Sequence, residues 1–287
     1  MPEHLWESVL CAVVAALLFA VAAVAQQRAA AAVPAGTGLM GALIRNPRWW
    51  AALVGDGGGY AMQVAALALG PVLLVQPILV SALVFALPLA ARLNGRRISA
   101  RTWATAVALV AALACFLLIG DPTDGNTTAP LGDWVWPLAL LLGFVALAVL
   151  VGRGGDPARC ALLFGAAGGS LFGLGSALTA CVAGQFDRGV LALLTNWQTW
   201  ALVAAGVAGF YLQQRAFHVG PLAASLPAIT VAEPLAAAFV GLTVLDERLR
   251  TTGLGFLAVA VAVIVMCVTT IRLSRTQAEE STREVVG

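Results

Sequence analysis

Charge is scarce in this sequence, and lysine is missing from it altogether. Only 10% of the 287 residues are charged, and all 16 basic residues are arginine. A soluble domain carries about 25% charged residues, so this composition excludes a soluble globular protein. The mean hydropathy of +0.93 predicts a chain solvated mainly by lipid. Arginine without lysine, beside abundant alanine, valine and leucine, favours a GC-rich bacterial source and hence the bacterial cytoplasmic membrane.

Other absences exclude classes of activity. Without lysine there is no phosphate-binding loop of the ATPase type, so ATP-driven transport by this chain is not expected. The only histidines are His4 and His218, and no nucleophile motif is present. The five cysteines form no CxxC pair and are expected to be small core residues; they are Cys11, Cys115, Cys160, Cys181 and Cys267. We expect neither an enzyme nor a cofactor nor a nucleic-acid partner.

Long apolar runs predict an all-α membrane protein. A bilayer-spanning helix needs roughly 20 mostly apolar residues, and runs that are continuous rather than alternating exclude a β-barrel. The first run begins with Glu3 and Glu7 and lacks a basic region, so we do not expect a cleaved signal peptide. Nine spans are predicted, over residues 5–26, 46–69, 71–92, 101–120, 134–152, 159–183, 196–218, 221–244 and 253–272.

Arginine is distributed unevenly between the connections. The connections after the first, third, fifth and seventh spans, together with the C-terminal tail, hold 13 arginines, and the other side holds 3. Basic residues favour the cytoplasm, so the N-terminus is predicted outside and the C-terminus inside. The loop 121–133, with three aspartates and no arginine, fits the outer face. The polar tail from Ser274 is predicted to be disordered.

An internal repeat appears when the sequence is shifted by 150 residues. Residues 43–77 lie over 193–227 without a gap, and Leu18-Phe19 matches Leu171-Phe172 at a slightly different offset. The identical pairs include Gly59/Gly209, Gln63/Gln213, Gly70/Gly220, Pro71/Pro221 and Pro77/Pro227.

The repeat unit comprises four spans, and a fifth span joins the two copies. The predicted units are 1–120, a loop and linker helix over 121–156, 157–273, and the tail 274–287. A single connecting span makes the second unit enter the membrane upside down. Inverted repeats of this kind are typical of transporters that work by alternating access.

Each four-span unit resembles a small multidrug resistance subunit, which works as an antiparallel dimer. The whole chain resembles a fused pair, in the drug/metabolite transporter superfamily. "NPRWWAAL…AALALGPVLLVQPILVSALV" (46–84) is similar to the NIPA-type magnesium transporter pattern, and "AEPLAAAFVGLTVLDERL" (232–249) is similar to the EamA-type signature. The first span lacks the glutamate of the small multidrug transporters. Tyr60 stands where the NIPA pattern has an acid, with Asp56 one turn earlier.

Two carboxylates are predicted near the middle of the membrane. Asp56 lies ~15 Å along its helix from residue 46, and Glu233 lies ~18 Å from Pro221. Intramembrane ionisable groups are expensive and usually face a cavity or a partner. In "GDGGG" an unwound turn would offer carbonyls and the Asp56 carboxylate to a cation; alternatively these glycines pack a helix and Asp56 bonds across it. Glu233 either binds cargo or a proton, or it is a structural acid that stays protonated or pairs with Arg215.

Supporting polar residues are expected to line the same midplane cavity. They are Tyr60, Gln63, Gln76, Tyr211, Gln213, Gln214 and Ser225, with Arg215 near the inner end of its span. Gly165, Gly169 and Gly173 recur every four residues, which is typical of helix packing rather than of a substrate site.

These patterns predict a secondary-active transporter that moves a small polar or cationic solute between two rocking four-helix units. Three alternatives stay open: a transporter of magnesium or another divalent cation, with Asp56 as the candidate ligand; a flippase for a lipid-linked head group; and a non-transporting membrane subunit or scaffold. A homodimer is also compatible with the sequence. A structure in which no cavity reaches either acid would favour the scaffold.

Overall fold

A computed structural model describes residues 5–31, 47–93 and 98–286, and this part of the chain is almost wholly helical. Its only β-type pairing is an isolated bridge between Pro122 and Leu249. The helices are α1 (Leu5–Ala31), α3 (Pro47–Leu69), α4 (Val72–Val80), α5 (Ala82–Leu93), α6 (Ala100–Gly120), α7 (Leu131–Val151), α8 (Pro157–Ala183), α9 (Val190–Thr195), α10 (Trp197–Val219), α11 (Leu222–Thr243) and α12 (Leu254–Val286), with a 3-10 turn at Phe186–Arg188.

Seven stretches of the described residues are long and apolar enough to cross a membrane. They are Leu5–Ala25, Val72–Leu93, Ala100–Gly120, Leu131–Val151, Pro157–Ala183, Ala224–Thr243 and Leu254–Thr276. The protein is therefore a multi-pass helical membrane protein. The second and seventh predicted spans coincide with α3 and α10, but these helices, which carry Asp56 and the Gln213–Arg215 run, are not among the seven.

Side-chain caps mark where several helices begin. The Asp156 carboxylate accepts from the N–H groups of Ala158 and Arg159 at 3.1 and 3.3 Å, and starts α8. Ser99 and Asn196 cap α6 and α10 in the same way. Such caps satisfy N–H groups that have no partner within the helix. In contrast, α4 and α11 begin after prolines that provide no side-chain cap.

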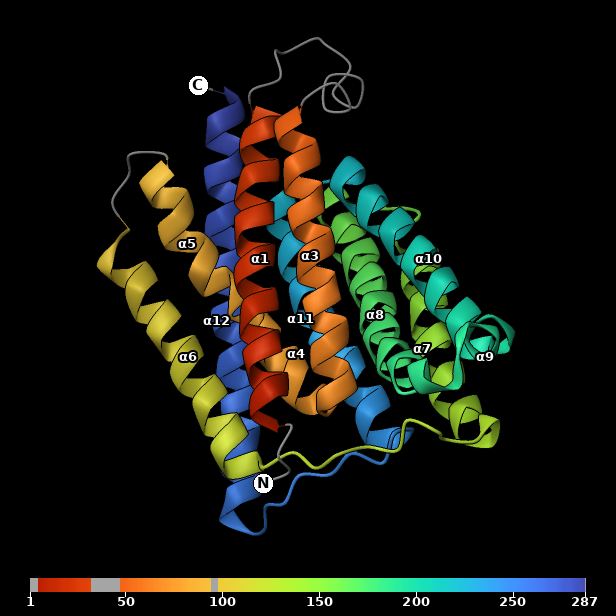
Figure 1. Cartoon of the computed structure of the whole chain (residues 1–287). Coiled ribbons are helices and arrows are strands. Elements are labelled where there is room, and N and C mark those ends of the chain that lie inside the picture. Colours follow the sequence, from red (N-terminus) through yellow and green to blue (C-terminus); the bar gives the residue numbers. More distant parts are fainter. Residues whose placement is uncertain (1–4, 32–46, 94–97, 287) are drawn as a thin grey trace.

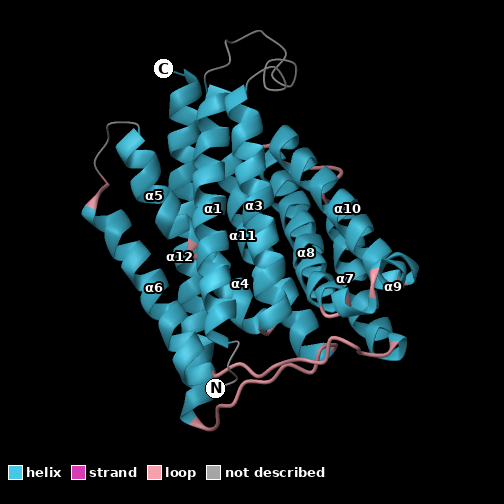
Figure 2. Cartoon of the chain, viewed as in Figure 1, coloured by secondary structure: helices cyan, strands magenta, loops and turns pink. Residues whose placement is uncertain are grey.

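The long helices run alternately up and down when α4 and α5 are taken together as one ascending stretch, so that α1 begins at one end of the bundle and α12 finishes at the other (Figure 1). We call these the lower end, where α1 begins, and the upper end, where α12 finishes. The segments 121–130 and 244–253 both cross the lower end, where they lie side by side as loops (Figure 2). The two helices that these loops follow, α6 and α11, therefore both descend.

The central element is α8, which packs against α7, α10, α11 and α3. Its glycine ridge is the reason why α11 approaches so closely. A Cβ atom added at Gly165 would lie 2.8 Å from the Ser225 carbonyl oxygen, and one added at Gly173 would lie 2.7 Å from the Ala237 nitrogen. The middle glycine, Gly169, faces the Ile229 backbone in the same way. The prediction that this ridge serves helix packing is confirmed.

Corresponding positions of the sequence repeat make corresponding contacts. A Cβ atom added at Gly59 of α3 would lie 2.7 Å from the ring of Phe19 in α1. One added at Gly209 of α10 would lie 3.1 Å from the ring of Phe172 in α8. Gly70, just after α3, likewise faces Ser8 near the beginning of α1. Gly220, just after α10, faces Ala161 near the beginning of α8. The α1–α3 and α8–α10 pairs thus meet through equivalent residues.

The C-terminal segment differs from its prediction. Instead of a disordered tail from Ser274, α12 continues as helix to Val286. The segment is rich in Ala, Glu, Gln and Arg, which have high helix propensity. It also extends a helix that is already formed, so that no new nucleation is required.

Candidate functional site

One face of α3 carries the predicted polar residues toward α8. Asp56, Tyr60 and Gln63 are spaced by four and three residues and therefore share a helix face. The Tyr60 hydroxyl lies 3.2 Å from the Thr179 hydroxyl, and the Gln63 amide donates to the Ser176 hydroxyl at 3.3 Å. Asp56, one turn before Tyr60, is partly buried on the same face. This polar face thus connects the first predicted unit to the second.

Glu233 lies at the contact between α11 and α8. Its backbone carbonyl faces Gly173 at the end of the glycine ridge, and its side chain is partly buried. Among the described side chains, none hydrogen-bonds or ion-pairs with its carboxylate. Arg215 takes no part, because its guanidinium lies over the Phe164 ring, 5.8 Å from the ring centroid, in a cation–π contact.

Gln76 lies in a small apolar cavity between α4, α6, α11 and α12. The cavity volume is ≈ 80 Å³, and the walls include Pro77, Phe116, Pro234 and Met266. The Gln76 side chain is 3% exposed, and its Nε2 atom has no hydrogen-bond partner among the described atoms. A buried amide without a partner is costly. This group is therefore available to a polar atom of a molecule that enters the cavity.

The other predicted site residues do not converge on that cavity. Tyr211, Gln214 and Arg215 are exposed along α10, and Gln213 is partly buried. Asp56 and Glu233 line none of three hollows in the described part of the chain, although Thr230 and Pro234 on either side of Glu233 line the first of them. Likewise, no group of three or more His, Cys, Asp or Glu residues suited to a metal ion occurs within residues 5–31, 47–93 and 98–286.

A residue that was not predicted as a site residue, although it belongs to the stretch 232–249 similar to the EamA-type signature, accepts two backbone hydrogen bonds at the lower end. Glu247, in the loop between α11 and α12, is 1% exposed. Its carboxylate accepts from the N–H group of Val72 at 2.7 Å and from that of Leu73 at 2.8 Å. It therefore caps α4, which has no cap of its own, from the opposite predicted unit.

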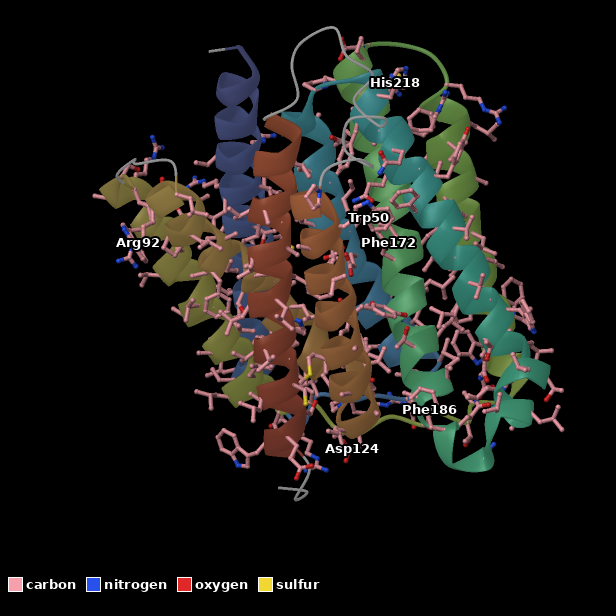
Figure 3. The ribbon with its side chains drawn as sticks, turned by 45° about the horizontal axis from the view of Figure 1, so that its top comes forward. Trp50, Arg92, Asp124, Phe172, Phe186 and His218 are labelled. Atoms are coloured by element: carbon pink, nitrogen blue, oxygen red, sulfur yellow. The ribbon has the colours of Figure 1, made fainter. Side chains whose placement is uncertain are left out.

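Both loops of the lower end enclose this carboxylate. The Thr123 N–H donates to the Arg248 carbonyl at 2.8 Å, and the Arg248 N–H donates back to the Thr123 hydroxyl at 2.9 Å. Gly125 lies so close to Glu247 that an added Cβ would be 2.7 Å from its Cγ. Asp124 of the same loop lies at the lower end, opposite His218 (Figure 3). These contacts hold the two loops and α4 together as one closed layer, which we call the Glu247 latch.

The environment of Glu247 favours its neutral form. Burial raises the pKa of Glu247 from the ordinary 4.5 to about 7, although the N–H groups of Leu73 and Val72 act in the opposite direction. The negative charge of Asp124 raises the pKa as well. The latch therefore contains a carboxyl group that titrates near neutral pH.

The first predicted unit has no equivalent of the Glu247 latch. No Asp or Glu occurs between residues 57 and 120, so the first unit offers no carboxylate to α11 at the upper end. The helix α11 begins at Leu222 without a side-chain cap. The two ends of the bundle are consequently held in chemically different ways.

Comparison with known proteins identifies a relative of almost equal length. An uncharacterized protein of Corynebacterium glutamicum is 34% identical over 278 residues, which cover 94% of this chain and 95% of the relative. No protein-family model matches the chain, and no solved structure matches it significantly. The similarity therefore extends over nearly the whole helical bundle, including α3, α8, α11 and the Glu247 loop.

Proposed function

The chain belongs to one family with the uncharacterized Corynebacterium glutamicum protein, and from this premise we propose that it is a secondary-active transporter that moves a small polar or cationic solute by alternating access. In this proposal the units 1–120 and 157–273 are inverted repeats of four spans each, and α7 joins them. The lower end faces outward and the upper end faces the cytoplasm, as the distribution of arginine indicates.

Equivalent contacts in the two units support the repeat. The Phe19–Gly59 contact of α1 and α3 corresponds to the Phe172–Gly209 contact of α8 and α10. The helices of one unit also pack on their counterparts in the other, since α4 contacts α11 and α6 contacts α12. Two units that share a packing plan can exchange conformations, which is the basis of alternating access in inverted repeats.

The difference between the two ends carries the proposal. The Glu247 latch closes the lower end across both units, and the first unit offers no carboxylate for a matching latch at the upper end. A transporter needs two states in which opposite ends are closed. The Glu247 latch would hold the state that is closed to the outside, and its opening would accompany the other state.

In this conformation neither Asp56 nor Glu233 lines one of the hollows described above, which is what the scaffold alternative expects. In our proposal the other conformation opens a cavity to both acids, and they would then hold the cargo or a coupling proton. They are carried by α3 and α11, which both pack on α8. Movement of one unit against the other would change the surroundings of both acids together. Tyr60 and Gln63, which hydrogen-bond to α8 side chains, would change partners in the same movement.

Uptake by the purified protein in liposomes tests this function. We would measure accumulation of ethidium, Mg²⁺ and a labelled neutral amino acid, each with and without a pH gradient. The parent should accumulate at least one of them, and Asp56→Asn and Glu233→Gln should abolish that accumulation. Asp133→Asn removes an exposed acid at the start of α7 and should transport like the parent.

Two outcomes contradict the proposal: no cargo accumulates, or both variants transport at the parent's rate. Hydrogen exchange then tests the alternating movement separately. With saturating cargo, the amides of Val72 and Leu73 should exchange faster, because the Glu247 latch opens in each cycle. Unchanged exchange during active transport would show that the Glu247 latch is not a gate.

A second candidate function is flipping of a lipid-linked head group. The cavity at Gln76 favours it, because the walls of this cavity are largely apolar and a single unpartnered amide faces them. Such a surface suits the junction between a hydrocarbon chain and its polar group. Gln76→Leu removes the amide while keeping a side chain of similar size, and it should abolish flipping of a fluorescent lipid while leaving uptake of a soluble cation unchanged.

A further inference from the structure

A second hollow lies between the beginning of α6 and the upper part of α12. Its volume is ≈ 270 Å³. Its walls are Arg101, Thr102 and Thr105 of α6 and Arg272, Leu273, Arg275 and Thr276 of α12. We call it the arginine cleft. It is chemically the opposite of the cavity at Gln76, although the same two helices contribute to both.

The arginine cleft carries positive charge without compensation. No carboxylate is among its walls, and none of the three arginines forms an ion pair with another side chain that the structure describes. The beginning of α6 adds to this charge, since the positive end of a helix dipole lies there. Three guanidinium groups in one hollow repel each other unless an anion lies between them.

The cleft also provides hydrogen-bond donors suited to an anion. These donors are the three guanidinium groups, because the hydroxyls of Thr105 and Thr276 donate to the carbonyls of Arg101 and Arg272 and the Thr102 hydroxyl pairs with that of Ser99. Buried Leu273, 1% exposed, forms an apolar floor. Arginine forks bind phosphate oxygens in pairs. Three guanidinium forks can engage the several oxygens of one phosphoryl group, whereas a halide offers no such set of acceptors.

The surroundings place the cleft at the level of lipid head groups. Trp103, in the same turn as Arg101, is 46% exposed, and tryptophan prefers the membrane–water interface. The apolar span of α12 extends to Thr276. A preference of arginine for the cytoplasmic side explains why arginines occur at this end. It does not explain why two helices direct three of them into one hollow.

We propose that the arginine cleft binds the phosphoryl group of an anionic membrane lipid at the upper end of the bundle. Basic pockets between transmembrane helices are suited to such head groups. Free phosphate offers the same oxygens without the hydrocarbon, so the experiment needs one arm for each source. The inference stands on the cleft alone and does not depend on transport.

Lipid retention by the full-length protein tests the proposal. Protein in phosphatidylcholine micelles would receive either phosphatidylglycerol or inorganic phosphate, and bound lipid would be measured by native mass spectrometry, with thermal unfolding as a second readout. In Arg272→Gln/Arg275→Gln, phosphatidylglycerol retention should fall about 10-fold or more. The matched control is Arg153→Gln/Arg159→Gln, which removes two exposed arginines from the same end of the bundle, outside the cleft.

The phosphatidylglycerol and inorganic phosphate experiments together distinguish a lipid site, a site for the soluble anion and no site. Retention that falls only in the cleft variant supports the lipid site. Stabilisation by inorganic phosphate alone, lost in the cleft variant, supports a phosphoryl site filled by the soluble anion. An equal fall in the cleft and control variants, or no fall in either, overturns the proposal. If the double variant does not unfold like the parent in phosphatidylcholine alone, Arg101→Gln replaces it in the same comparison.

Discussion

Two helix contacts, which we call seams, involve corresponding helices of the sequence repeat but different residues. One seam joins α1 to α4 and α5, and the other joins α8 to α11. With the offset that relates Phe19 to Phe172, the three ridge glycines of α8 correspond to Ala12, Ala16 and Ala20 of α1, all buried. Glycine lets the α11 backbone approach α8 more closely than a methyl group would allow. The second unit is therefore the more tightly packed of the two.

The burial of α8 and of α1 by the rest of the protein differs in the same direction. In the most apolar stretch of each helix, 78% of the α8 stretch is buried inside the protein, against 39% of the α1 stretch. The linker helix α7 packs on α8. Because the chain has a single linker helix, it covers α8 and not α1. The helix α8 is thus buried at the centre of the bundle, whereas its counterpart in the sequence repeat, α1, is less covered.

The largest predicted effect comes from adding a methyl group to the tight seam. Gly173→Ala should lower the free energy of unfolding by about 3 kcal/mol, because the new Cβ meets the α11 backbone, which cannot rotate away as a side chain can. Reversible unfolding in mixed micelles measures this. Gly143→Ala in α7 has open space around it and should raise stability by up to about 1 kcal/mol. Equal stability of the two variants would show that the seam is not tight.

Removal of the Glu247 latch should have the next largest effect. Glu247→Ala leaves the N–H groups of Val72 and Leu73 without their acceptor, which should cost about 2 kcal/mol. It should also speed hydrogen exchange at the beginning of α4 and leave exchange at the beginning of α11 unchanged. If both helices respond alike, the ends of the bundle do not differ as described.

The pH dependence of stability isolates the charge of Glu247. Its pKa is about 7 in the folded protein, against 4.5 ordinarily, so between these values the folded state binds a proton that the unfolded state has lost. The stability that this group contributes is therefore complete below about pH 4.5 and decreases as the pH rises through 7. The melting temperature of the parent should fall between pH 5.5 and pH 8 by more than that of Glu247→Gln. Parallel curves would contradict the assignment.

The smallest effect is expected in the looser seam. Ala16→Gly gives α1 the residue type of the α8 ridge, and it should cost about 1 kcal/mol through backbone entropy and lost contact. Because α1 carries the less covered seam, the variant should still fold and, if alternating access operates, still transport. A loss larger than that of Gly173→Ala would reverse the order of the two seams.

The sequence was sufficient to predict much of the helical framework and the packing role of Gly165, Gly169 and Gly173, because apolar runs and four-residue spacings are local patterns. It also suggested Gln63 and Gln76 as interior polar groups. The role of Glu247 could not be predicted in this way, since its partners lie more than 170 residues earlier. The available signals were Pro71, which begins a helix without a cap, and the position of Glu247 inside the stretch similar to the EamA-type signature. The exposure of Tyr211 and Gln214 depends on how α10 packs, which helical spacing alone does not determine.

The distance in sequence between α4 and its cap has a consequence for synthesis of the protein. Val72 leaves the ribosome 175 residues before Glu247, which corresponds to about 10 to 35 seconds of translation. Throughout that time the first amides of α4 lack the acceptor that they have in the finished protein. The beginning of α4 therefore reaches its final hydrogen bonding only after the loop between α11 and α12 has been made.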